Sequence, residues 1–170
     1  MSNSLKLPDV MPDIVPATLL VVCDSHHCRL IDVGGHTMLE HGSVDSGELK
    51  HADRQSTKVG PSGGVGIGDD HHAEDQRLTN FSKTILERVG TLIASQKIEA
   101  LYLAAPSRLL SVLKKQMPEA MKKVLKSAID GTFVKESAID VLMRFRPDLE
   151  SSVVKLRDQE NYSSKKHLPK

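Results

Sequence analysis

Hydrophobic and polar positions in the first third of the chain predict three short strands. Residues 17–24 (ATLLVVCD) form an apolar, β-branched run, which is typical of a buried strand. Residues 28–35 (CRLIDVGG) and 37–44 (TMLEHGSV) form two further runs, and a glycine pair closes the first of them. Because only tight turns separate the three runs, we expect an antiparallel meander.

A helical pattern begins near His71 and is the strongest periodic signal in the chain. Glu74 and Asp75 fall in its first turn, where the helix dipole favours acidic side chains. Apolar residues then recur every three or four positions, which predicts one long amphipathic helix. These residues are Leu78, Phe81, Ile85, Leu86, Val89, Leu92 and Ile93.

The remainder of the chain alternates between strand and helix patterns. The expected elements are a strand over residues 98–106, helices over 107–117 and 119–127, a strand over 128–134 and a helix over 135–145. Ser107 and Ser137 are expected helix N-caps, and Pro147 stops the last helix. The order is therefore βββαβααβα. It predicts an α/β fold with a mixed five-stranded sheet and helices packed on it.

The chain divides into one domain and three segments without periodicity. Residues 1–16 carry three prolines and are expected to form a flexible N-terminal arm. Residues 17–147 form the single α/β domain, and residues 148–170 have few apolar anchors and predict a flexible tail. Residues 45–70 form a long glycine-rich loop inside the domain. A loop of this length is usually functional or disordered.

The composition of the chain limits the classes of function that are expected. The net charge of +1 gives no overall attraction to nucleic acid or membranes, so such a contact needs a local basic patch. Residues 1–16 lack the apolar core of a signal peptide, and no apolar run approaches the roughly 18 residues of a membrane span. These patterns predict a cytoplasmic protein without membrane insertion. Cys23 and Cys28 lack the second half of a zinc site and are expected to be small residues in a strand pair.

The most unusual stretch is KVGPSGGVGIGDDHHAED, residues 58–75, with five glycines in nine residues. A phosphate-binding loop requires G-x-x-x-x-G-K-[ST], and a dinucleotide site requires G-x-G-x-x-G. Neither pattern is present. Residues 60–64 (GPSGG) match the letters of the G-x-S-x-G elbow of serine hydrolases, but no strand leads straight into them and nothing places a base beside Ser62. We therefore expect no bound cofactor.

The acidic and histidine residues after the glycines leave a second interpretation open. Asp70, His71, His72 and Asp75 are candidate metal ligands at helical spacing. They would make the protein a metal-dependent hydrolase or nuclease that uses the cluster at residues 69–75. However, H-E-x-x-H is absent, and the helix dipole alone accounts for acidic residues at this position. The strand carboxylates Asp24, Asp32 and Asp130 have no spacing that indicates a two-metal site.

Five sequence blocks, taken in order, resemble a known family. They are LLVVCDSHHCRLIDVGG, ADRQSTKVGPSGGVG, HAEDQRLTNFSKTILERV, LYLAAPSRLL and DGTFVKESAI. In this order the chain resembles the host-attachment protein family, bacterial relatives of the central domain of archaeal and eukaryotic peptide release factors. The resemblance covers residues 17–146 and implies a ribonuclease H-like three-layer fold. The family name also implies a part in attachment to a host.

The resemblance gives the glycine-rich loop a role. In release factors a glycine-glycine-glutamine loop before the long helix enters the peptidyl-transferase centre, and the matching residues here are Gly63, Gly64 and Val65. Valine has no amide with which to position a water molecule, so catalysis is not expected. What remains is a non-catalytic module that binds the ribosome, RNA or protein partners. Its expected contact residues are Arg54, Lys58, Gly63, Gly64, Val65 and Gly66. A third interpretation is a plain interaction module that oligomerises through its sheet, and the sequence leaves the oligomeric state open.

Overall fold

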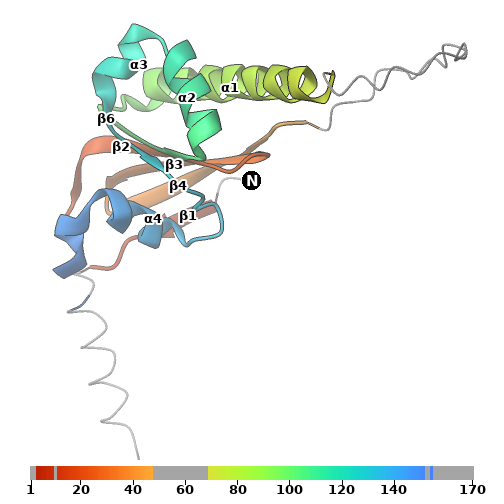
Figure 1. Ribbon diagram of the computed structural model, residues 1–170. Coiled ribbons are helices and arrows are strands. Elements are labelled where there is room, and N and C mark those ends of the chain that lie inside the picture. Colours follow the sequence, from red (N-terminus) through yellow and green to blue (C-terminus); the bar gives the residue numbers. More distant parts are fainter. Residues whose placement is uncertain (1–2, 10, 48–68, 152–153, 155–170) are drawn as a thin grey trace, which may run out of the picture.

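The protein is an α/β sandwich built on one six-stranded mixed sheet (Figure 1). The computed structural model describes residues 3–9, 11–47, 69–151 and 154. The strands are β1 (Asn3–Lys6), β2 (Ile14–Cys23), β3 (His27–Gly35), β4 (Thr37–Asp45), β5 (Ala100–Ala105) and β6 (Leu125–Asp130). The helices are α1 (Asp69–Gln96), α2 (Ser107–Gln116), α3 (Glu119–Val124), α4 (Ala138–Phe145) and the short 3-10 helix η1 (Pro147–Leu149).

The strand order is β1-β4-β3-β2-β5-β6. Strands β2, β3 and β4 form the expected antiparallel meander, and β5 and β6 add in parallel on the other side of β2. Helices α1, α2 and α3 cover one face of the sheet, and α4 lies on the opposite face (Figure 1). The predicted α/β class and mixed sheet are confirmed, but the prediction of five strands is wrong because β1 adds a sixth.

The additional strand comes from the segment that was expected to be a loose arm. Residues 3–6 pair antiparallel with β4, so that Ser4 lies opposite Leu39. Leu7, Met11 and Ile14 are each no more than 2% exposed. Local periodicity did not reveal this strand because its partner lies more than thirty residues further along the chain. The described part of the arm therefore belongs to the folded domain.

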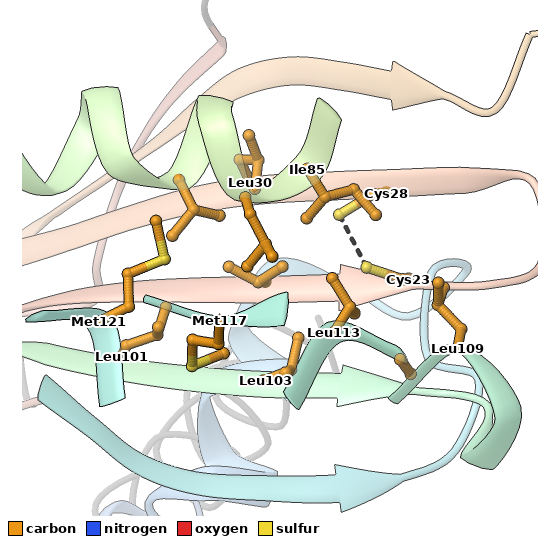
Figure 2. Packing of buried hydrophobic residues seen from close by; sticks show 14 of the residues in the cluster. Cys23, Cys28, Leu30, Ile85, Leu101, Leu103, Leu109, Leu113, Met117 and Met121 are labelled. Atoms are coloured by element: carbon orange, nitrogen blue, oxygen red, sulfur yellow. Dashed lines mark hydrogen bonds between the residues drawn. The ribbon is translucent and has the colours of Figure 1, made fainter. Parts of the chain in front are cut away.

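Strand β2 lies at the centre of the sheet and is buried on both faces. Leu19 and Val21 point to the cluster under α1, α2 and α3, whereas Leu20 and Val22 point to the cluster under α4. This explains why its sequence reads as a continuous apolar run rather than an alternating one. Figure 2 shows the first cluster, in which α1 and α2 side chains such as Ile85 close over the strands.

The two cysteines form a buried cross-strand pair of free thiols, as the sequence predicted. Cys23 and Cys28 are register partners on β2 and β3, and the thiol of Cys23 donates a hydrogen bond to Cys28 Sγ at 2.8 Å (Figure 2). Burial raises the pKa of the Cys23 thiol well above its ordinary value, so the neutral form is favoured. Both residues thus act as small core side chains.

Two helix caps were predicted, and one of them is present. The Ser137 side chain accepts a hydrogen bond from the Asp140 amide at 3.1 Å and caps α4. The prediction for Ser107 is wrong, because Ser107 is the first residue of α2 and Pro106 occupies the N-cap position without a side-chain cap. Strand β6 also begins three residues earlier than expected and ends before Gly131.

The packed domain extends beyond residue 147, where the sequence predicted its C-terminal end. Leu149, in η1, is only 1% exposed and joins the cluster under α4. Most of the predicted C-terminal tail, residues 155–170, lies outside the described residues. In the part of the chain that the structure describes, no helix has the length and apolar character required to cross a membrane.

Candidate functional site at the base of the glycine-rich segment

The predicted contact residues from Arg54 to Gly66 lie in residues 48–68, outside the described part of the chain. The structure does place the two ends that flank this segment. The Ser46 amide, just after β4, donates to His26 O at 2.7 Å. Arg77, in the third turn of α1, donates to Ser25 O at 3.0 Å and Ser46 Oγ at 3.3 Å. We call residues 24–27, 45–47 and 71–77 the loop base.

The turn between β2 and β3 holds the first part of the loop base in a fixed shape. Asp24 Oδ1 accepts hydrogen bonds from the amides of His26 and His27, each at 2.7 Å. The Asp24 amide in turn donates to His27 O at 2.8 Å. An aspartate that accepts from amides two and three residues later is a common way to fix a tight turn. The carbonyls that receive Arg77 and Ser46 are thereby held in place.

An exposed ion pair connects the two strands that meet at the loop base. His27 Nδ1 lies 2.6 Å from Asp45 Oδ1, and both side chains are exposed. The hydrogen bond to Asp45 raises the pKa of His27 above its ordinary value of 6.5. Among the described residues, no serine or cysteine is hydrogen-bonded to the His27 ring. This pair therefore has the geometry of a surface contact and not of a nucleophile with its base.

We expect the pKa of His27 to fall towards 6.5 in Asp45→Asn, because the amide removes the negative charge that stabilises the protonated ring. A raised pKa in the folded state favours folding below the ordinary pKa of histidine. That contribution is lost as the pH rises through the folded value. The measurement is an NMR titration of the histidine ring protons. His26, beside it on the same turn, is the internal control, and an unchanged His27 titration would contradict the ion pair.

Arg108 connects the start of α2 to the first turns of α1. Its guanidinium lies 3.0 Å from Glu74 Oε1 and 2.7 Å from Asp75 Oδ1. The hydrogen bond to Asp75 is the main reason that the pKa of Arg108 is raised. These acidic residues, which the sequence explained by the helix dipole, thus also neutralise a cation from a different helix.

The metal-site candidates are not brought together by the described structure. Asp75 contacts Arg108, and His71 and His72 are exposed. The side chain of Asp70 lies outside the described part. Across residues 3–9, 11–47, 69–151 and 154, no group of three histidine, cysteine or acidic side chains is arranged to hold a metal ion.

The strand carboxylates also form no metal-binding group of three among the described residues. Asp24 is used in the turn at the end of β2, and Asp130 ends β6. Asp32 lies on β3, where burial raises its pKa and His41 Nε2, at 3.7 Å, opposes that rise. The geometry therefore gives no support to the metal-dependent hydrolase or nuclease.

Sequence reasoning missed the arginines that organise the loop base. Arg77 and Arg108 look like ordinary solvent-facing helix residues, and no local pattern distinguishes them from Arg88. Their roles depend on a hydroxyl, a carbonyl and a carboxylate that are 31 to 52 residues away in sequence. The resemblance to release-factor relatives does not single them out either, because Arg88 lies in the same resembling block as Arg77.

The fold and the loop base can now be compared with known proteins. The sequence profile of the bacterial archaeo-eukaryotic release factor family 12 matches residues 17–144. The chain belongs to this family. The match begins in β2 and ends in α4, so it includes the whole loop base and the glycine-rich segment. The predicted relationship to peptide release factors is confirmed.

Two solved structures are similar to this member of family 12. The crystal structure of the archaeal translation termination factor aRF1 matches with 8% identity and a TM-score of 0.46, over 88% of this chain and 41% of that one. Dom34 of S. cerevisiae, a translation termination-like factor that is involved in RNA quality control pathways and interacts with Hbs1, matches with 13% identity and a TM-score of 0.39. That match covers 88% of this chain and 40% of Dom34. No curated protein matches the chain.

Proposed function

We propose that this family 12 protein is a non-catalytic module that binds the ribosome or its RNA through the glycine-rich segment. Membership of a release-factor family is the observation that carries the proposal. The proposed contact residues are Arg54, Lys58, Gly63, Gly64, Val65 and Gly66. Arg54 and Lys58 supply cations for phosphate groups, and the glycines allow the backbone to approach another molecule closely.

The geometry of the loop base supports this proposal. A segment that contacts a large partner needs a firm attachment at both ends if its position is to be reproducible. Here Arg77 joins α1 to the residue after β4 and to the turn between β2 and β3. Arg108 adds a second connection from α2. The two flanks of residues 48–68 are therefore held by polar contacts to a packed domain.

Val65 is the reason that we propose binding without hydrolysis. Release of a peptide from tRNA requires a water molecule placed against the ester and donors aimed at the developing oxyanion. Val65 offers only methyl groups at the position that matches the glutamine of release factors. The backbone amides of Gly63 and Gly64 alone do not complete that arrangement.

The proposal predicts that the chain co-sediments with bacterial ribosomes and does not release peptide from them. Arg54→Gln combined with Lys58→Gln should weaken binding and lower the slope of log affinity against log salt by about 2, roughly one unit for each phosphate that is no longer neutralised. Lys97→Gln, at an exposed lysine directly after the C-terminal end of α1, is the control with an unchanged slope. Peptide release is measured on stalled ribosomes, with Val65→Gln beside the unmodified chain.

Each arm of this experiment has a decisive outcome. Robust release by the unmodified chain would overturn the non-catalytic assignment. Absence of ribosome binding at low salt would overturn the ribosome proposal. Binding that is equally weakened by Lys97→Gln would show general charge attraction and would contradict a specific role for the segment.

Two finer predictions belong with this proposal. The ribonuclease H-like assignment is supported by the antiparallel meander β2-β3-β4, to which β5 and β6 add in parallel after helical connections. A role in host attachment stays a prediction that follows from the family resemblance alone.

A further inference from the structure

Strand β6 forms one edge of the sheet and carries a self-complementary charge pattern. Among the described strands it pairs only with β5. Its residues Lys126 and Asp130 are both exposed, and neither has an ion-pair partner among the described residues. Exposed edges are sites at which another strand adds, unless they are covered or blocked.

The backbone groups that face outwards on β6 can be identified from its pairing with β5. The Gly131 amide donates to Ala105 O at 3.1 Å, so the Gly131 amide points towards β5. Along a strand, alternate residues direct their amides and carbonyls to the same neighbour. The amide and carbonyl of Ile129 therefore also point towards β5. The amides and carbonyls of Ala128 and Asp130 point away from β5, towards the open edge.

The side chains between the two charges suit a close approach. Ala128 is half-buried against the cluster under α2 and α3, so no bulky group projects at the middle of the strand. Lys126 lies at the irregularity where the pairing moves from Leu125 opposite Leu101 to Ser127 opposite Tyr102. A lysine alone at a sheet edge protects that edge from other strands. Here, however, Lys126 lies two residues before Ala128 and Asp130 lies two residues after it. A two-fold axis at Ala128 therefore places Lys126 of one copy opposite Asp130 of the other.

We propose that β6 is a homodimer interface, in which β6 of a second copy adds antiparallel with Ala128 on the two-fold axis. In this register Lys126 lies opposite Asp130 of the second copy, and Asp130 lies opposite its Lys126. Opposite charges that face each other on paired strands stabilise the pair, and like charges destabilise it. The outward amide and carbonyl of Ala128 bond to the same groups of the second copy, as a two-fold interface requires.

A second copy fits this edge better than an unrelated strand because the same six residues supply both charges of each pair. The two sheets become one continuous twelve-stranded sheet. In each copy, α2 and α3 remain packed on one face of this sheet. The loop base lies away from β6, at the turn between β2 and β3 and the end of β4, so the interface is independent of the proposed ribosome contact.

Sedimentation velocity of the full chain over a range of concentrations tests the proposal. The weight-average mass should rise above 18.6 kDa towards twice that value as concentration increases. Lys126→Asp and Asp130→Lys, each alone, place like charges opposite each other and should abolish the rise. The double variant Lys126→Asp/Asp130→Lys should restore it, because both pairs are re-formed with exchanged signs.

Two further variants separate the interface from folding and from net charge. Ala128→Pro removes an amide that points away from β5, so it should block the dimer and leave the circular dichroism of the monomer unchanged. Lys115→Asp, on the exposed surface of α2, alters the net charge as Lys126→Asp does and should leave the dimer intact. A chain that stays at 18.6 kDa at every concentration overturns the proposal. So does a dimer that tolerates the single charge reversals, or a double variant that stays monomeric.

Discussion

Phe81→Ala should lower the free energy of unfolding by about 3–5 kcal/mol, the usual cost of emptying a large buried aromatic site. Phe81 lies on the inner side of α1, is only 2% exposed and is among the largest fully buried side chains. It belongs to the cluster that joins α1 to the central strands and to α2. Since α1 is the element that follows the glycine-rich segment, its packing also fixes the second flank of that segment.

The measurement is urea unfolding followed by circular dichroism, because the chain has no tryptophan to report by fluorescence. Lys83→Ala is the matched control on the same helix, because Lys83 is exposed and its truncation should cost no more than about 0.5 kcal/mol. A decrease of less than about 1 kcal/mol for Phe81→Ala would show that α1 does not depend on this side chain. Equal decreases in the two variants would contradict the assignment of the inner face.

Arg29→Met should cost about 2–4 kcal/mol, because it removes the cation from a partly buried network on the face of the sheet that α4 covers. Arg29 Nε and Nη2 donate to the two oxygens of Glu40, at 2.7 and 3.2 Å. Arg29 Nη1 donates to the carbonyls of Val134 and Glu136, both at 2.8 Å. Truncation leaves one carboxylate and two carbonyls without these donors, and the incomplete burial of the pair keeps the cost below that of a fully buried charge.

A double-mutant cycle isolates the ion pair from the rest of this network. Glu40→Gln should cost less than Arg29→Met, because the carbonyls of Val134 and Glu136 keep their donor. The double variant should cost less than the sum of the two single variants. Arg88→Met, on the exposed side of α1, is the control for removal of an arginine. Additive costs would show that Arg29 and Glu40 contribute independently, and would contradict the network.

The network also explains how the segment between β6 and α4 is held against the sheet. Arg29 binds carbonyls 105 and 107 residues further along the chain. Arg144 on α4 forms an ion pair with Glu136, and its guanidinium lies 4.3 Å from the centre of the Phe133 ring. These contacts anchor one short segment from both sides. We therefore expect Arg29→Met to loosen α4 before it affects α1.

Much of the candidate site could not be predicted from sequence, and the reason is sequence distance. The Ser137 cap was predictable because donor and acceptor are three residues apart. The contacts of Arg77 with Ser25 and Ser46 span 52 and 31 residues, and nothing in the neighbourhood of Arg77 indicates them. Ser107 shows the opposite error, since a residue with the right local pattern has no capping role once Pro106 takes that position.

Local sequence patterns were sufficient to predict the elements that bury an apolar face and the family to which the chain belongs. The apolar stripe on α1 was predictable because burial of one helix face repeats apolar residues every three or four positions. The apolar run of β2 was predictable because burial on both faces favours apolar residues at consecutive positions of the strand. These patterns could not predict three features of the fold: the place of β1, the partners of Arg29 and Arg77, and the open edge of β6. Each of these features depends on which distant parts of the chain pair with one another through hydrogen bonds. The sequence around a polar residue is the same whether its side chain binds water or a distant carbonyl, so it does not reveal the partner.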